Sequence, residues 1–169
     1  MKRMLLTLSI FYAHSCFAQE RKEDFINKIV QIKYTLSGID TLPGYHYLVE
    51  STIRIDKKSS VWGMKYMTRY IPKNIKEELF RRLAVDTFTE KWNCEALIET
   101  RCIVDSSSIQ EGLPYYAFSK PIFDDNRKYA LIQVNRGYAK SPIGGFAVLI
   151  FNKKNGKWEF LENIADNEN

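Results

Sequence analysis

Two stretches in the first half of the chain carry apolar residues at the spacing of an amphipathic helix. Residues 20–36 place Phe25 and Ile29 on one stripe, with Glu and Lys residues on the opposite side. Residues 73–83 repeat this spacing, and the pattern permits an extension as far as Trp92. We therefore expect two helices, each with one buried face.

Between these helices, apolar and polar residues alternate. Alternation predicts strands at residues 47–55 and 61–70, because successive side chains of a strand point to opposite faces. The polar residues 57–60 between them read as a turn, so this region is expected to form a hairpin.

The second half of the chain predicts more strands. These are expected at residues 115–123 (interrupted at Pro121), 129–135, 146–151 and 157–164, with a turn at 124–128 and a loop at 139–145. The run 146–151 is apolar at every position, as expected for a central strand that is covered on both faces. Asn155-Gly156 predicts a type I′ turn, in which both residues need positive φ. The polar end, residues 166–169, is expected to fray.

Together these elements predict an α+β domain over residues 19–169. An N-terminal helix and a second helix would pack on a curved antiparallel β-sheet of about five or six strands. A cone-shaped fold like that of the nuclear transport factor two superfamily and a different helix-on-sheet arrangement both fit this pattern.

Residues 1–18 have the pattern of a secretory signal peptide. Lys2 and Arg3 precede a short apolar run, and small residues follow it. The run is about half the roughly 20 residues that span a bilayer, so no transmembrane helix is expected in the mature protein. Cleavage after Ala18 fits the small-residue rule, whereas cleavage before Cys16, which would leave a lipid-anchored cysteine, fits it less well. The protein is expected to be exported, to the periplasm or the medium.

The charge distribution and the cysteines bear on the type of partner and on the stability of the domain. The formal net charge is +5, but acidic and basic residues are interspersed, so no basic stripe for nucleic acid is visible. Cys94 and Cys102 would form a disulfide in an oxidising compartment if the chain between them bends back. The alternative is a pair of buried thiols.

No residue pattern predicts a reaction, a metal or a cofactor. His46 is the only histidine after the predicted signal peptide, and it would have to serve any acid-base enzyme that does not use carboxylates. Asp124-Asp125-Asn126 could offer oxygen ligands to calcium, but these residue types are also common in turns. Gly144-Gly145 lacks the spacing of a nucleotide-binding loop and reads as a tight turn before a strand.

Tyrosines are frequent along the strands and suggest where a partner could bind. Tyrosine suits both strands and recognition surfaces, since it offers a large ring with a polar tip. A binding site is therefore expected on the sheet face carrying Tyr115 and Tyr138, beside the loop that holds Ser141, Gly144 and Gly145.

The last third of the chain resembles a cassette found in many small exported bacterial proteins of unknown function. The residues that carry the resemblance are Phe118-Ser119-Lys120-Pro121-Ile122-Phe123, Tyr129-Ala130-Leu131-Ile132, Gly144-Gly145 and Asn155-Gly156-Lys157-Trp158. Those proteins often carry cysteines before the double glycine, where this chain has Arg136-Gly137-Tyr138 and Ser141-Pro142-Ile143. The resemblance implies export and an antiparallel sheet, and no activity.

Three functions are compatible with the sequence. The first is a non-enzymatic binding or accessory domain of the bacterial cell envelope, with a protein partner or a small ligand. The second is an inhibitor or immunity-type protein that neutralises a toxin in the periplasm. The third is a small hydrolase that uses His46 or buried carboxylates.

Overall fold

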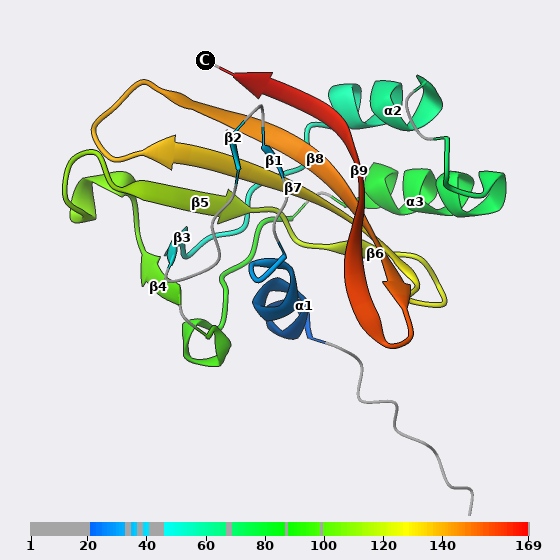
Figure 1. Cartoon of the computed structure of the whole chain (residues 1–169), viewed down its shortest axis with the longest axis horizontal. Coiled ribbons are helices and arrows are strands. Elements are labelled where there is room, and N and C mark those ends of the chain that lie inside the picture. The colour runs from blue at the N-terminus through cyan, green and yellow to red at the C-terminus, as the bar shows by residue number, and fades with distance from the viewer. Residues whose placement is uncertain are drawn as a thin grey trace, which may run out of the picture.

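The computed structural model of the protein describes residues 21–32, 35–36, 39–40, 46–66, 69–86, 88–98 and 100–168 (Figure 1). Its helices are α1 (Lys22–Ile29), α2 (Lys57–Tyr66), α3 (Lys73–Val85) and the short 3-10 helices η1 (Cys94–Ala96) and η2 (Ser106–Ser108). Its strands are β1 (Thr35–Leu36), β2 (Ile39–Asp40), β3 (His46–Val49), β4 (Thr100–Ile103), β5 (Pro114–Phe118), β6 (Ile122–Phe123), β7 (Tyr129–Tyr138), β8 (Gly144–Lys154) and β9 (Lys157–Glu168). The predicted signal peptide, with Cys16, lies outside the described residues.

A seven-stranded sheet forms the centre of the molecule, in the order β4-β3-β5-β7-β8-β9, with β6 paired to β7. The strands from β5 onwards pair in antiparallel fashion, whereas β3 runs parallel to both of its neighbours. Parallel neighbours need a crossover connection, and the chain between β3 and β4 provides it with α2 and α3. The predicted α+β fold is confirmed, but the sheet is mixed rather than purely antiparallel and has more strands than expected.

Helix α1 packs on one face of the sheet. Phe25 makes edge-to-face contacts with Phe123, Phe151 and Trp158, at ring-centroid distances of 5.3, 5.7 and 5.0 Å. Such pairs add to the stabilisation that burial of the rings already gives. Phe25 and Ile29 are fully buried here, which confirms the predicted apolar stripe.

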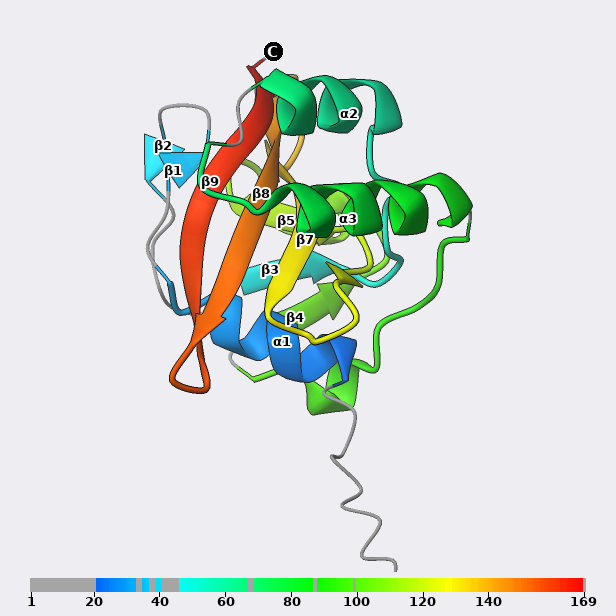
Figure 2. The same cartoon turned by 90° about the vertical axis from the view of Figure 1, so that its right-hand side faces the viewer.

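Helices α2 and α3 pack on the opposite face (Figure 2). Leu79 and Leu83 of α3 and Met64 of α2 join Leu131 and Ile150 in one buried cluster. Strand β8 contributes residues to the clusters on both faces, so the prediction of a central, covered strand is confirmed.

Residues 57–66 form helix α2. The prediction of a turn at residues 57–60 followed by a strand from residue 61 was therefore wrong. Asp56 precedes the helix, and its carboxylate accepts hydrogen bonds from the backbone N–H groups of Lys58 and Ser59 at 3.0 and 3.3 Å. These contacts satisfy N–H groups that a helix start leaves unpaired. The alternation of apolar residues that suggested a strand does not correspond to burial, because Trp62 is exposed while Met64 is buried.

Both predicted helices end earlier than their patterns allowed. Helix α1 stops at Ile29 rather than residue 36, and the chain turns at residues 30–32. Helix α3 stops at Val85, because residues 90–92 form backbone hydrogen bonds with residues 50–52 and are therefore extended. Of the predicted strand 47–55, only the first residues, up to Val49, form a regular strand, as part of β3. Beyond them, Ser51 and Ile53 form isolated bridges.

The C-terminal strands are longer than predicted. β8 and β9 form a ladder that reaches from the Asn155-Gly156 turn to the pair Gly145 and Glu168. Asn155 and Gly156 have φ values of 50° and 79°, as the predicted turn requires. The expected fraying of residues 166–168 was wrong, because pairing with β8 provides hydrogen bonds that outweigh the weak β preference of Asp and Asn.

Candidate functional site

A groove of about 850 Å³ that is lined by many charged side chains lies at the C-terminal end of α3. It is lined by Arg21 and Lys22 at the start of α1, Arg82, Val85 and Asp86 at the end of α3, Glu90, residues 120–125 of the β6 region and Arg127. We call this set of residues the charged groove. Its members come from three segments that are far apart in the sequence (residues 21–22, 82–90 and 120–127) and are brought together by the packing of α1 and α3 around β6.

Most carboxylates of the charged groove are paired with cations. Asp86 forms an ion pair with Lys120 at 3.2 Å, and Glu90 forms one with Lys22 at 3.1 Å. Asp125 forms an ion pair with Arg82. These pairs fix the positions of charged groups that would otherwise move freely in solvent.

Arg82 is the centre of a small network at the end of α3. Its Nε lies 3.2 Å from Oε1 of Glu78, and its Nη2 contacts Asp125. The backbone N–H of Asp125 in turn donates to Glu78. The hydrogen bond from Arg82 holds the pKa of the Asp125 carboxyl below its ordinary value, so this group is ionised at neutral pH.

Asp124 differs from the other acids of the charged groove. Only 1% of it is exposed, and its Oδ1 accepts hydrogen bonds from the backbone N–H groups of Lys128 and Tyr129 at 2.7 and 2.6 Å. Its Oδ2 is buried and has no hydrogen-bond partner among the described residues. The guanidinium of Arg127 lies over the ring of Phe123, 4.3 Å from its centroid, in the same turn.

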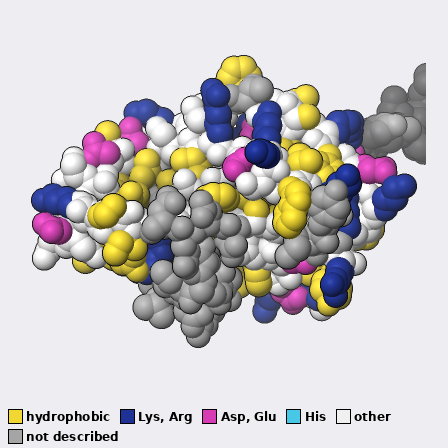
Figure 3. Space-filling model, turned by 90° about the horizontal axis from the view of Figure 1, so that it is seen from above, with side chains coloured by type: hydrophobic (Ala, Val, Ile, Leu, Met, Phe, Trp, Pro, Cys, Tyr) yellow, Lys and Arg dark blue, Asp and Glu magenta, His cyan; other side chains and the backbone are white. Residues whose placement is uncertain are grey.

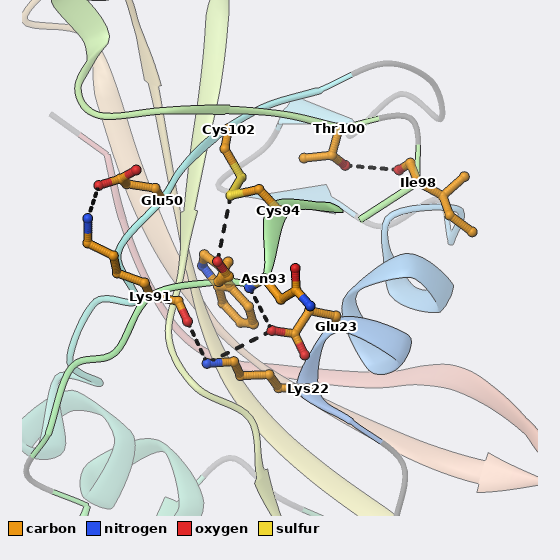
Figure 4. The surroundings of a disulfide bond; sticks show 10 residues. Lys22, Glu23, Glu50, Lys91, Asn93, Cys94, Ile98, Thr100 and Cys102 are labelled. Atoms are coloured by element: carbon orange, nitrogen blue, oxygen red, sulfur yellow. Dashed lines mark hydrogen bonds and ion pairs between the residues drawn. A yellow bond between two sulfur atoms is a disulfide. The ribbon is translucent and has the colours of Figure 1, made fainter. Parts of the chain in front are cut away.

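The wall formed by α1 is held in place by polar contacts to the segment after Glu90 (Figure 4). Nζ of Lys22 donates to the carbonyl oxygen of Lys91 at 2.8 Å, and Oε1 of Glu23 accepts from the N–H of Asn93 at 2.9 Å. One turn further along α1, Asn27 donates to the carbonyl oxygen of Ala96 and accepts from the N–H of Ile98. These contacts align the start of α1 with one side of the charged groove.

The same segment is joined to the sheet by a disulfide. Cys94 in η1 is bonded to Cys102 in β4, with the two Cα atoms 6.0 Å apart (Figure 4). The prediction of a Cys94–Cys102 disulfide is confirmed, and the alternative of two buried thiols is excluded. The bond ties the segment that contacts α1 to the edge strand β4.

The structure does not place the predicted tyrosine pair on one face. Tyr115 pairs with Gly137 across the β5–β7 ladder and packs beside Ala139, whereas the neighbouring Tyr138 points to the other side of the sheet. There the Arg136 guanidinium lies 5.0 Å from the centroid of the Tyr138 ring. The expectation that Tyr115 and Tyr138 share a face was therefore wrong.

The other predicted site residues have structural contacts. Ser141 follows β7, and its hydroxyl oxygen accepts a hydrogen bond from the N–H of Ile143 at 3.1 Å. Gly144 and Gly145 lie within β8 rather than in the predicted turn. A Cβ at Gly144 would lie 2.8 Å from the carbonyl oxygen of Arg136, so close pairing of β7 and β8 requires glycine there.

Two further candidates can be placed only in part. His46 begins β3, but its side chain is not among those described, so its role stays a prediction. Residues 124–128 form the predicted turn between β6 and β7. Across the described residues, no group of three or more His, Cys, Asp or Glu side chains could hold a metal ion.

A second hollow, of about 630 Å³, lies between α2 and β9. Trp62, which is 57% exposed, lines it together with Asp56, Ser59 and the β9 residues 163–165. Seen from above, the molecule carries apolar side chains between scattered basic and acidic ones (Figure 3). This hollow has fewer charged groups than the charged groove, so we base the functional argument on the latter.

No family model matches this chain, and neither a curated protein nor a solved structure is significantly similar to it. In the described part of the chain, no helix is long and apolar enough to cross a membrane.

Sequence reasoning did not find the charged groove. Asp124 was considered only as a turn residue or a calcium ligand, and nothing connects it in the sequence with Lys22, Val85 or Glu90. The one local signal was the buried surroundings of Asp124, which is flanked by the apolar pair Ile122-Phe123.

Proposed function

We propose that this chain is an exported, non-enzymatic binding domain of the bacterial cell envelope, and that its partner binds in the charged groove. The single observation that carries the proposal is Asp124, which lines the groove and whose buried Oδ2 has no hydrogen-bond partner among the described residues. Buried polar atoms normally have partners, and one that lacks a partner needs an explanation, such as a bound water or ion or a functional role. Export is supported by the sequence pattern of residues 1–18 and by the resemblance of the last third of the chain to small exported proteins.

The surroundings of Asp124 support binding rather than acid-base catalysis. A general acid at neutral pH needs a raised pKa, whereas the pKa of the neighbouring Asp125 is lowered by its hydrogen bond to Arg82. Asp86 and Glu90 are likewise engaged in ion pairs. Fixed charges of both signs are suited to recognising a polar surface with a complementary pattern.

The apolar rim of the groove supports a protein partner. Val85 lines the groove and is 73% exposed, and Phe88, three residues further along the chain, is 78% exposed. Exposed apolar side chains beside paired charges are common in protein interfaces. A protein partner would include the inhibitor or immunity-type function among the forms that this role can take.

The proposal is tested by affinity purification of the tagged full-length protein from its native envelope, followed by mass spectrometry. The test compares Val85→Arg, which extends a long cationic side chain into the groove, with Val104→Arg. Val104 is 70% exposed, outside the groove, and therefore gives the same change of chemistry at a similar exposure.

We expect a stoichiometric partner with the wild type and with Val104→Arg, and a strongly reduced yield with Val85→Arg. Equal recovery with both variants would show that the partner binds elsewhere. Recovery of no partner with the wild type would contradict a protein-binding role.

A further inference from the structure

Asp124 is held in one orientation by the turn that it begins. Its Oδ1 accepts from the N–H groups of Lys128 and Tyr129, and its carbonyl oxygen accepts from the N–H of Arg127 at 3.0 Å. Its own N–H donates to the carbonyl oxygen of Tyr129 at 3.1 Å. The carboxylate therefore cannot turn to exchange its two oxygens without breaking hydrogen bonds.

The two oxygens of this carboxylate have different surroundings. Oδ1 receives two hydrogen bonds, while Oδ2 receives none from the described residues although it is buried. Leaving a charged group buried and incompletely hydrogen-bonded is costly, and the cost is recovered when a donor reaches it. A donor that reaches Oδ2 therefore gains more than one that meets a carboxylate already paired. Because Oδ2 has almost no exposed surface, a ligand donor reaches it only when neighbouring side chains of the groove move aside.

Most of the cations that line the groove are paired with other acids, and Arg127 lies over the ring of Phe123. Lys120 is paired with Asp86 and Lys22 with Glu90, while Arg82 contacts Asp125 and Glu78. Each of these pairs would have to break before its cation could reach Oδ2.

We propose that Asp124 binds a cationic nitrogen of the ligand, either a primary ammonium or a guanidinium, that enters the charged groove. This inference rests on the proposed function of the groove and names the chemistry that its partner must present. A cation is favoured over a neutral hydroxyl, because hydrogen bonds between two charged groups are the stronger ones and because it compensates the buried negative charge.

Val85 adds a second feature of the ligand. Lysine and arginine side chains lay their alkyl stems along apolar surfaces while the charged end reaches a polar partner. Val85, on the rim of the same groove, provides such a surface. A cation carried on an alkyl chain would use both features of the groove, and it can belong to a protein side chain or to a small amine.

The first test is an NMR titration of the wild-type protein with n-butylguanidinium and n-butylammonium as probes, and with n-butanol as the uncharged control. The reporters are the backbone amides of Lys128 and Tyr129, which donate to Asp124. The amide of Ser107, which donates to the exposed Asp105 at 2.7 Å, is the matched control for the same type of hydrogen bond.

We expect saturable shifts of the Lys128 and Tyr129 amides with the two cations, and none with n-butanol. The Ser107 amide should move little. Absence of a saturable shift with either cation, or equal shifts at Ser107, would overturn the proposal.

The second test is the variant Asp124→Asn, with Asp105→Asn as its control. Asparagine keeps one oxygen for the turn and replaces Oδ2 by an NH₂ group, which repels a cationic donor. We expect cation binding to weaken by about tenfold or more. Unchanged cation binding by folded Asp124→Asn would overturn the proposal. If this variant does not fold, the proposal is judged by the titration of the wild-type protein.

The envelope purification separates this inference from the proposed function. Loss of the partner with both Val85→Arg and Asp124→Asn supports the groove and the cation. Loss of the partner with Val85→Arg but not with Asp124→Asn would support the groove as the binding site and would contradict the proposal that Asp124 binds a cation. Retention with both variants contradicts both. A titration response without a protein partner identifies a small amine as the source of the cation.

Discussion

Gly63 of α2 lies directly against the backbone of Ile164 in β9. A Cβ added at Gly63 would lie 1.9 Å from the carbonyl oxygen of Ile164, a distance that no real contact reaches. The helix can approach the strand this closely only because residue 63 has no side chain.

We expect Gly63→Ala to destabilise the protein by about 2 kcal/mol, even though alanine is the better helix former. The reason is that a backbone atom of β9, rather than a flexible side chain, would have to move. Chemical denaturation measures the free energy of unfolding. The control is Val61→Ala on the exposed side of the same helix, which should change stability by less than about 0.5 kcal/mol. Equal stability of wild type and Gly63→Ala would mean that α2 does not sit against β9 at this point.

The N-cap of α2 can be tested at Asp56. The hydrogen bond from the Ser59 hydroxyl is the main cause that lowers the pKa of the Asp56 carboxyl. Asp56→Ala should cost about 1 kcal/mol at neutral pH, while Asp56→Asn should retain most of the stability. Because the folded pKa lies below the ordinary value, the advantage of the wild type over Asp56→Ala should disappear as the pH falls through that folded pKa. A loss of the same size with Asn would exclude capping as the reason.

The Cys94–Cys102 disulfide should contribute about 2.5 kcal/mol, given the loop of 8 residues that it closes. We expect the double variant Cys94→Ser/Cys102→Ser to lose this amount in chemical denaturation, and reduced wild-type protein to lose a similar amount. Amide hydrogen exchange should accelerate at Asn93 and Ile98, whose N–H groups donate to α1, and much less at Gln133 within the sheet. Uniform acceleration at all three amides would show that the bond stabilises the whole fold rather than the contact with α1.

The raised pKa of the Glu162 carboxyl should make the stability of the protein depend on pH. Burial raises the pKa of its carboxyl above the ordinary value of 4.5, and Lys76 and Arg69 only partly oppose this. The ionised form is therefore less favourable in the folded than in the unfolded protein. Stability should fall as the pH rises from the unfolded pKa through the higher folded pKa.

Glu162→Gln should remove this loss, so the variant should gain stability relative to the wild type at neutral pH and lose that gain in acid. The control is Glu159→Gln, in the same strand, where the carboxylate is exposed and paired with Lys154 at 3.3 Å. Denaturation curves at several pH values measure the difference. A wild type and Glu162→Gln that respond identically to pH would contradict the raised pKa.

The parts of the fold that were predictable are those in which the apolar residues match the buried faces. Leu79 and Leu83 recur at helical spacing because one face of α3 lies against the core. Ala130, Leu131 and Ile132 of β7 are all buried because both faces of that strand are covered. Helix α2 was missed because its apolar residues happen to alternate. Its helical state depends on the cap at Asp56 and on contact with Ile164, about a hundred residues away.

The site was less predictable than the fold. The tyrosines were assigned to one face, although residues 115 and 138 face opposite sides once the β5–β7 register is known. The charged groove depends on the place where α3 ends, and that place is set by backbone pairing with residues 50–52. Neither the register nor this pairing leaves a local pattern in the sequence.

The contacts of Phe25 have a consequence for the order of folding. This residue belongs to α1, yet the rings that bury it, Phe151 and Trp158, belong to β8 and β9, about 130 residues further along the chain. During synthesis, α1 therefore leaves the ribosome long before its packing partners. Its native contacts can form only once the β8–β9 hairpin exists.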